Sequence, residues 1–352
     1  MSDIHTNTQE LPIIPGEEPA PKRRRGLRRF LIVLASIIAV LAIIAGVVFA
    51  LIASSFGDIK RVSLEQDPSL KRPTSSIGTN ILLLGSDATE ATDVSLEGSD
   101  LTGNRSDSIM VAQIAPNGGS VTVMSIMRDN WVEIQGHGEA KINAAMSLGG
   151  LPLAVNTVEN FIGARIDHVA MVDFESFKGL TDALGGVTVT NDQAFTTSDG
   201  QFTFEPGDIT LSGEQALGFV RERYAFSDGD YQRARNQQTY LKGLTRGILS
   251  ADTLTSPGKI VSTFDALKPY LVLDDGFDTP TLVSLGLQSR NVRGDDITFF
   301  TSPTLGTGTS PDGQSIVLPN WDELALVQEA FATGTLDEYV VNVQPGAEVP
   351  QG

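Results

Sequence analysis

Four arginines stand close together near the middle of a chain whose formal net charge is -18. The segment from Arg221 to Gln238 reads RERYAFSDGDYQRARNQQ, and its arginines are Arg221, Arg223, Arg233 and Arg235. The planar guanidinium fork suits phosphate or carboxylate better than the point charge of lysine does. The segment therefore predicts an anion-binding site, in which Glu222, Asp228 and Asp230 would hold the guanidinium groups in place. A salt-bridged surface helix is the alternative interpretation, because structural ion-pair networks are common.

The spacing of these residues indicates which of them act together. Arg221 and Arg223 are two residues apart, so their side chains point to the same side of an extended segment. Asp230 is suited to cap a following helix, in which Arg233 and Gln237 share one face and Arg235 lies roughly opposite. Residues that would anchor this helix lie near the same side, namely Tyr240, Leu241 and Leu244. We therefore expect a cluster of Arg221, Arg223, Arg233 and Gln237.

A second group of charged residues is expected at one edge of a β-sheet. Residues 80–84, 108–114 and 121–127 are predicted strands, and the turn at 116–119 makes the last two a hairpin. In such a meander the end of the first strand, the start of the second and the end of the third share one edge. That edge collects Asp87, Arg105, Asp107 and Arg128. Two carboxylates and two arginines are what a Mg²⁺-bound diphosphate needs. Turn formation and capping are the alternative roles of Asp87 and Asp107.

Further periodic segments complete a layered α/β fold. Lys141-Ile142-Asn143 is expected to open a helix that ends near Gly149-Gly150, and residues 152–162 form the next helix. A strand, a helix and a strand follow over 167–174, 175–184 and 187–190. Ser212 and Gln215 form a capping box for the helix that leads into Arg221. The remaining predicted elements are helices over 260–267, 279–287 and 321–331 and a strand over 297–301. We predict a single α-β-α domain with a mixed central sheet over residues 78–340.

The N-terminal part has the composition of a membrane anchor. Residues 1–29 form a polar tail that ends in a basic cluster, and an apolar run from Phe30 to Ala53 is broken only by Ser36. At about 1.5 Å per residue this run crosses a hydrocarbon core of about 30 Å as a single transmembrane helix. The basic cluster places the N-terminus in the cytoplasm and the domain outside the cell membrane. A cleaved signal peptide is the alternative, but its apolar region covers only about 7 to 15 residues. A juxtamembrane linker is expected over 54–77 and a flexible tail over 341–352.

Composition excludes several classes of function. The chain contains no cysteine, so neither disulfides nor thiolate metal sites are available. The pI of about 4.5 argues against a nucleic-acid partner, which would require a basic face. The sequence has no GxxxxGK[ST] motif, no GxSxG motif and no pair of histidines at metal-binding spacing. A metal, if bound, is therefore held mainly by oxygen ligands.

Several blocks occur in the order in which they occur in one known family. They are GSD (85–87), NRSDS (104–108), VMSIMRD (123–129), KIN (141–143), IDHVAMVDFESF (166–177), DALGGV (182–187), LSGEQALGFVRER (211–223) and GDYQRARNQQ (229–238). With these blocks, which cover roughly residues 78–250, the chain resembles the LytR-CpsA-Psr family. A cytoplasmic tail followed by a single membrane span is also the layout of that family.

The resemblance implies a membrane-anchored phosphotransferase that uses Mg²⁺ or Mn²⁺. Such an enzyme moves a glycopolymer from a polyprenyl-pyrophosphate carrier to peptidoglycan and forms a phosphodiester, with the lipid in an apolar groove. By position, Asp87 and Asp107 would hold the metal and, with Arg105, form the catalytic group. The pyrophosphate would be bound by Arg128, Arg221, Arg223, Arg233 and Gln237, together with Arg105. Lys141 and Asp230 would contact the pyrophosphate directly or support the residues that do.

The chain departs from the family pattern at three positions. Thr89 stands where members often have an arginine, Met127 replaces a proline before the RD pair, and Asn236 replaces an arginine before QQ. The first difference would alter metal or acceptor handling, and the others would change local geometry. The general base stays open between Asp87, Asp107 and a metal-bound hydroxide. Two other functions are also open, namely a lipid-pyrophosphate phosphatase and a non-catalytic binder of lipid-linked polymer that regulates wall assembly.

Overall fold

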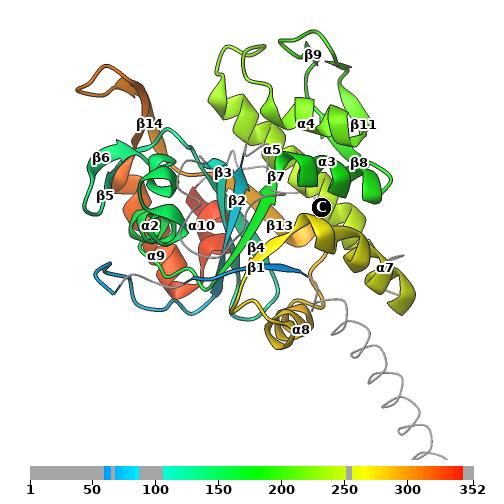
Figure 1. Cartoon of the computed structure of the whole chain (residues 1–352), viewed down its shortest axis with the longest axis horizontal. Helices are drawn as coiled ribbons and strands as arrows, with labels where there is room; N and C mark the ends of the chain where they lie inside the picture. The colour runs from blue at the N-terminus through cyan, green and yellow to red at the C-terminus, as the bar shows by residue number, and fades with distance from the viewer. Residues whose placement is uncertain (1–58, 65–67, 87–105, 251–255, 344–352) are drawn as a thin grey trace, which may run out of the picture. The chain divides into compact units, whose positions relative to one another are not determined.

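The computed structural model describes residues 59–64, 68–86, 106–250 and 256–343. These residues belong to one compact unit, which Figure 1 shows with the central sheet between two groups of helices. The predicted cytoplasmic tail and the predicted span over residues 30–53 lie outside the described residues. Within the described ranges, none of the helices has both the length and the apolar character to cross a membrane.

The centre of the fold is a seven-stranded sheet, and its parallel and antiparallel pairs confirm the predicted mixed sheet. Its strands lie in the order β1 (Lys60–Val62), β12 (Val272–Asp274), β7 (His168–Asp173), β2 (Thr79–Ser86), β3 (Ser106–Ile114), β4 (Val121–Ile126) and β13 (Ile297–Thr301). The predicted meander is confirmed, because β2 is antiparallel to β3 and β3 is antiparallel to β4. The register pairs Leu84 with Ile109 and Ile109 with Ile126, so the end of β2, the start of β3 and the end of β4 share one edge.

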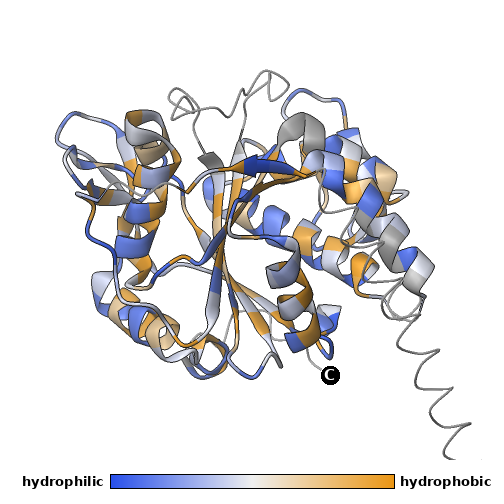
Figure 2. Ribbon diagram, turned by 60° about the horizontal axis from the view of Figure 1, so that its bottom comes forward, coloured by the Kyte–Doolittle hydropathy of each residue, from blue (hydrophilic) through white to orange (hydrophobic). Residues whose placement is uncertain are grey.

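Alternation along β2 explains why both faces of the sheet carry helices. Leu82 and Leu84 are buried on one face, against a core that includes residues of α2 (Ala144–Ile162), α9 (Trp321–Thr333) and α10 (Leu336–Val343). Ile81 and Leu83 point to the other face, because side chains alternate along a strand. The helices on that side include α3 (Phe174–Ala183), α4 (Gly213–Arg221), α5 (Asp230–Ile248) and α7 (Pro257–Leu267). Apolar residues follow the central strands and the inner sides of these helices (Figure 2).

Smaller elements lie around the central layers. In the described part of the chain, two-stranded sheets are formed by β5 (Trp131–Ile134) with β6 (Gly138–Lys141), β8 (Val187–Asn191) with β11 (Gly207–Leu211), β9 (Phe195–Thr196) with β10 (Thr203–Phe204), and β14 (Thr304–Thr309) with β15 (Ser315–Pro319). The helix α8 (Thr279–Gln288) and the short 3₁₀ turns η2 (Lys268–Tyr270) and η3 (Gly294–Asp296) complete the fold. The capping box before α4 is present, and the backbone N–H of Ser212 donates to Oε1 of Gln215 at 3.0 Å.

Two predicted boundaries differ from the structure. Lys141 does not open a helix, because it ends strand β6, and the helix begins at Ala144. The two helices expected over 141–162 are joined in α2, which is kinked where Gly149 and Gly150 leave helical geometry. Gly150 has a φ of 66°, which glycine adopts without steric cost. The kink therefore lies where the sequence predicts an end.

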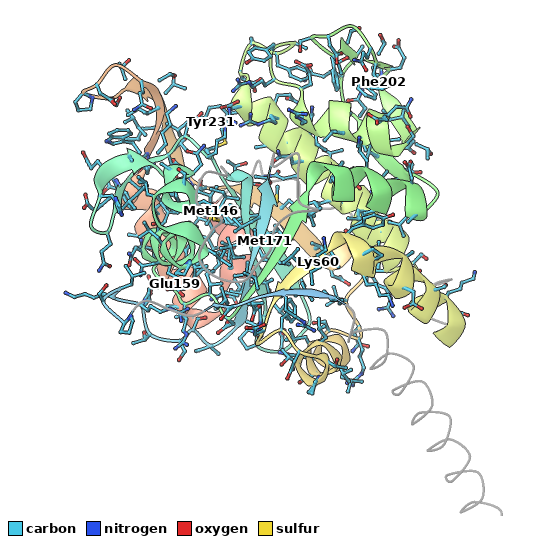
Figure 3. The ribbon with its side chains drawn as sticks, viewed as in Figure 1. Lys60, Met146, Glu159, Met171, Phe202 and Tyr231 are labelled. Carbon is cyan, nitrogen blue, oxygen red and sulfur yellow. The ribbon has the colours of Figure 1, made fainter. Side chains whose placement is uncertain are left out.

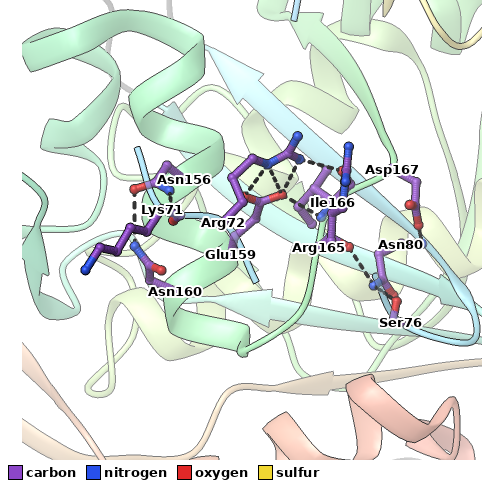
Figure 4. A network of polar contacts seen from close by, with 10 residues as sticks. All are labelled: Lys71, Arg72, Ser76, Asn80, Asn156, Glu159, Asn160, Arg165, Ile166 and Asp167. Atoms are coloured by element: carbon purple, nitrogen blue, oxygen red, sulfur yellow. Dashed lines mark hydrogen bonds and ion pairs between the residues drawn. The ribbon is translucent and has the colours of Figure 1, made fainter. Parts of the chain in front are cut away.

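Part of the predicted linker over residues 54–77 is built into the domain. Strand β1 extends the sheet by pairing in parallel with β12. Further along, the Arg72 guanidinium donates to the fully buried Glu159 carboxylate, with Nε 2.8 Å from Oε2, and to the carbonyl of Ile166 at 3.0 Å (Figure 4). The backbone N–H of Ile166 in turn donates to Glu159 at 2.9 Å. These contacts attach the segment before β2 to α2.

Candidate active site

Three arginines surround one carboxylate at the start of α5. The Oδ1 atom of Asp230 lies 3.2 Å from Nη1 of Arg233 and 3.3 Å from Nη1 of Arg223. Its Oδ2 atom lies 4.0 Å from Nε of Arg128. These residues come from α5, from the loop after α4 and from the chain that follows β4, so the tertiary fold brings them together. Figure 1 shows these elements around one end of the sheet.

Asp230 stays ionised because of these neighbours. Burial alone would raise the pKa of its carboxyl, but the positive charges of Arg233 and Arg128, a side-chain hydrogen bond with Asp129 and the charge of Arg223 together outweigh this effect and lower the pKa. The side chain is only 19% exposed, so water weakens the attraction less than it would at the surface. An ionised Asp230 fixes the positions of two guanidinium groups before any ligand arrives. Pre-positioned charges of this kind are what electrostatic stabilisation of a reaction requires.

A second carboxylate extends the cluster toward β6. Asp129 lies 3.1 Å from Nζ of Lys141 and 3.8 Å from Nε of Arg128. Lys141 therefore approaches the site through the β5–β6 hairpin, although it does not begin a helix. Lys141 is linked to the arginine cluster through Asp129, which pairs with both Lys141 and Arg128.

A cavity of about 410 Å³ opens beside this cluster, between the sheet and helices α3, α4 and α5. We call it the arginine cavity. The described residues that line it include four arginines and no carboxylate. Its other walls are mainly apolar and consist of Leu83, Leu84, Met110, Ala170, Val172, Phe177, Leu180, Val220, Leu241, Leu244 and Leu271 with Tyr240. A single space thus combines a hydrocarbon-like wall with a concentrated positive charge.

The predicted cluster of Arg221, Arg223, Arg233 and Gln237 is confirmed, since all four line this cavity together with Arg128. Gln237 also contacts the start of β3, where its Oε1 accepts from the Ser108 hydroxyl at 3.2 Å. Arg235 lies away from the cavity as predicted, and it is bonded to Asp228 and to Gln232. The face assignment along α5 was therefore correct.

Three details of the prediction were wrong. Arg221 and Arg223 do not share an extended segment, because Arg221 ends α4 and the chain becomes extended only at Glu222. Asp230 is the first residue of α5 and not its cap, because its carboxylate is occupied by arginines and Gly229 takes the cap position with a φ of 49°. Glu222 does not hold a guanidinium group. Its buried carboxylate accepts backbone N–H groups instead, from Ser198 at 2.6 Å and from Ala225 at 2.9 Å.

The predicted metal and catalytic residues lie mostly outside the described part of the chain. Asp87 and Arg105 belong to residues 87–105, and of Asp107 only the backbone is described. That backbone lies in β3, where Ser106 pairs with Ser86, the last residue of β2. Among the described residues, no group of three or more His, Asp or Glu side chains could hold a metal ion.

Two features near the cluster were not predicted from the sequence. The sequence assigned no separate role to Asp129, whose carboxylate pairs with Lys141 in the structure. Tyr224 is 73% exposed, and its ring stacks on Arg223, whose guanidinium carbon lies 4.6 Å from the ring centroid. Its position directly after the RER sequence was the available signal, because arginine often stacks on aromatic rings.

Comparison with known proteins shows to which family the chain belongs. The model of the LytR-CpsA-Psr family matches residues 52–332. The chain belongs to this family. The LytR-CpsA-Psr match covers both the arginine cluster and the walls of the arginine cavity.

Three relatives illustrate the similarity within the LytR-CpsA-Psr family. The chain is 31% identical over 290 residues to the cell wall biosynthesis protein LcpA of Corynebacterium glutamicum, covering 72% of this chain and 55% of that protein. It is 33% identical over 228 residues to the polyisoprenyl-teichoic acid–peptidoglycan teichoic acid transferase TagU of Enterococcus faecalis, covering 64% of this chain and 71% of that protein. The crystal structure of Bacillus subtilis TagV superposes with a TM-score of 0.59 at 27% identity, over 76% of this chain and 98% of that one. The chain thus spans little more than half the length of LcpA.

Proposed function

We propose that this LytR-CpsA-Psr protein transfers a glycopolymer from a polyprenyl-pyrophosphate carrier to peptidoglycan. The observation that carries the proposal is the composition of the arginine cavity, in which four arginines adjoin an apolar wall. A polyprenyl pyrophosphate has the matching chemistry, a long hydrocarbon chain attached to a highly charged anion. The name of the similar E. faecalis protein, a polyisoprenyl-teichoic acid–peptidoglycan transferase, supports the same assignment.

The reaction is a displacement at phosphorus. A hydroxyl oxygen of the acceptor sugar forms a bond to the sugar-side phosphorus, the bond from this phosphorus to the bridging oxygen breaks, and polyprenyl phosphate leaves. The hydroxyl proton passes to a general base. Negative charge grows on the bridging oxygen, where Arg223 and Arg233 stabilise it without having to reorganise, because Asp230 already holds them.

A divalent cation, Mg²⁺ or Mn²⁺, is part of the proposal. The described carboxylates near the cluster are engaged, Asp129 by Lys141 and Asp230 by arginines. Asp87 and Asp107 are the residues that would hold the cation, as the sequence predicts. When bound, the cation would neutralise part of the pyrophosphate charge. Attachment to the cell membrane by a single N-terminal span, with the domain on the outer side, would bring the site to its lipid substrate.

The test measures release of polyprenyl phosphate by the full-length protein in detergent. The substrate is a polyprenyl-pyrophosphate-linked saccharide, supplied with Mg²⁺ and soluble peptidoglycan fragments. Arg233→Lys keeps the charge but removes the planar fork, and it should lower the rate about tenfold or more. The control is Arg290→Ala, which removes an exposed arginine whose Nη1 donates to the carbonyl of Leu287.

The outcomes separate the three functions. Mg²⁺-dependent transfer to peptidoglycan that Asp107→Asn abolishes supports the proposal. Release that continues without peptidoglycan and yields only hydrolysed saccharide indicates a phosphatase. Tight binding of the lipid without release, unchanged by Asp107→Asn, indicates a binder and refutes the assignment of the metal.

A further inference from the structure

A second cavity lies on the other side of α5. It measures about 490 Å³, and its walls include α5, the edge strand β13, the end of β8 and the start of β14. A smaller cavity of about 220 Å³ adjoins it and shares four of its lining residues, Thr190, Asp192, Thr239 and Lys242. We call the two together the α5–β13 cleft. None of the residues assigned to the pyrophosphate lines this cleft.

The α5–β13 cleft is elongated along the helix. Its lining begins at Tyr231 and ends at Arg246, fifteen residues further along α5. At about 1.5 Å per helical residue this corresponds to roughly 22 Å. A cleft of this length fits a short chain of linked units better than a single small molecule.

The charges of the cleft favour a neutral ligand. The larger cavity is lined by two basic residues, Arg235 and Lys242, and by two acidic ones, Asp192 and Glu323. The smaller cavity adds Arg246, whose guanidinium is bonded to Asp295 at 2.8 Å. The arginine cavity, by contrast, is lined by four arginines and by no described acidic residue, and Asp230 beside it pairs with Arg223 and Arg233. A phosphate would therefore prefer the arginine cavity, and an uncharged polar ligand suits the cleft.

The polar wall of the cleft is already organised. Arg235 is bonded to Asp228 and donates from Nε to Oε1 of Gln232 at 2.9 Å. Gln232 donates to Asn236 at 2.9 Å, and Asn236 donates to the carbonyl of Phe219 at 3.0 Å. Planar polar side chains held in this way lose little conformational entropy when a ligand binds. They offer hydrogen bonds at fixed positions, which recognition of sugar hydroxyls and acetamido groups requires.

Tyr231 places one end of the cleft beside the arginine cluster. Its ring is partly exposed and projects from α5 toward β14, where its hydroxyl lies 2.8 Å from Oγ1 of Thr304 (Figure 3). The residue before it is Asp230, the carboxylate that holds Arg223 and Arg233. An amphipathic ring fixed at this position provides an apolar face for a sugar.

We propose that the α5–β13 cleft binds the acceptor as a neutral oligosaccharide, whose chain lies along α5 with one end near Tyr231. The role as acceptor rests on the proposed function, whereas binding of an oligosaccharide does not. The same helix then presents Arg233 and Gln237 to the donor on one face and sugar-binding groups to the acceptor on the other. The cleft thereby provides a structural reason for transfer to a sugar hydroxyl in preference to water.

The test is direct binding of a neutral probe, the tetramer of β-1,4-linked N-acetylglucosamine. Its affinity for the full-length protein in detergent is measured by saturation-transfer NMR. Thr239→Trp fills the wall shared by both cavities, and Gln232→Ala removes one link of the polar wall without adding bulk. Gln232→Ala should weaken binding by up to about tenfold for each hydrogen bond lost, whereas Thr239→Trp occupies the space of the ligand and should weaken binding by about tenfold or more. Thr333→Trp, on the exposed end of α9, is the matched control.

Inorganic pyrophosphate separates the two sites. We expect its affinity to change less than twofold in all three variants and the tetramer not to compete with it. Competition between the two ligands, tetramer binding that Gln232→Ala and Thr239→Trp leave unchanged, or no binding to the unaltered protein would each overturn the proposal. If the tetramer binds in the cleft but no polyprenyl phosphate is released, the proposed transferase function fails while the saccharide site stands.

Discussion

Replacing Asp230 by asparagine tests whether this carboxylate organises the site. The change keeps the shape of the side chain and removes its charge. Asp230 lies 3.2 and 3.3 Å from two guanidinium nitrogens, and its side chain is only 19% exposed. A buried charge-assisted hydrogen bond contributes about 1.5 to 3 kcal/mol. Because Arg223 is 31% exposed, we discount its contribution for solvent screening and expect a total loss of about 2 kcal/mol.

Asp228→Asn is the matched control. Asp228 pairs with Arg235, and the two side chains are 42% and 49% exposed, so this pair should contribute less than about 1 kcal/mol. The melting temperature of the full-length protein in detergent should fall by roughly 3 to 6 °C in Asp230→Asn and by less than about 2 °C in Asp228→Asn. Equal shifts for the two variants would refute the role of Asp230 as the centre of the cluster.

The pH dependence provides the second half of this test. The folded structure lowers the pKa of Asp230, so the ionised carboxylate stabilises the fold above the ordinary pKa of about 3.9. This contribution is lost as the pH falls through the lowered value, because the group is then protonated in both states. The difference in melting temperature between the unaltered protein and Asp230→Asn should therefore stay constant from pH 7 to about pH 5 and become smaller below about pH 4. A difference that grows on acidification would contradict the assigned cause.

Two further predictions concern how the site is supported. Glu159→Gln removes a fully buried charge that pairs with Arg72. Arg72 keeps the attraction of Asp167 and its bond to the Ile166 carbonyl, so we expect a loss of about 3 kcal/mol, whereas Glu329→Gln at an exposed position should change the melting temperature little. An equal effect of both would show that burial of the pair is unimportant. Gly243→Ala would place a Cβ atom 2.3 Å from the carbonyl oxygen of Thr188 and should destabilise the packing of α5 on β8. Gly247→Ala on the same helix meets no atom within 4 Å and should stabilise it by up to about 1 kcal/mol, so the two glycines should shift melting in opposite directions.

Local patterns in the sequence were sufficient for much of the architecture. The alternation and the turn around residues 116–119 predicted the β3–β4 hairpin, because the side-chain period and the turn chemistry are local properties. Helical spacing was also sufficient to place Arg233 and Gln237 on one face of α5 and Arg235 on another. Several strands escaped prediction, and the shortest of them, such as β1 and β12 with three residues each, carry little periodic signal.

The partners of charged groups were decided only by the tertiary structure. Sequence showed that Glu222, Asp228 and Asp230 are near arginines, but it did not show that Asp230 alone would lie among three of them. Glu222 instead accepts hydrogen bonds from backbone N–H groups. The loop after α4 buries its carboxylate beside N–H groups that do not bond within a helix or sheet. The sequence did not predict the α5–β13 cleft either, because its walls come from elements far apart in the chain. Sequence determined which residues carry charge and on which helix face they lie, whereas only the fold decided which of those charges meet.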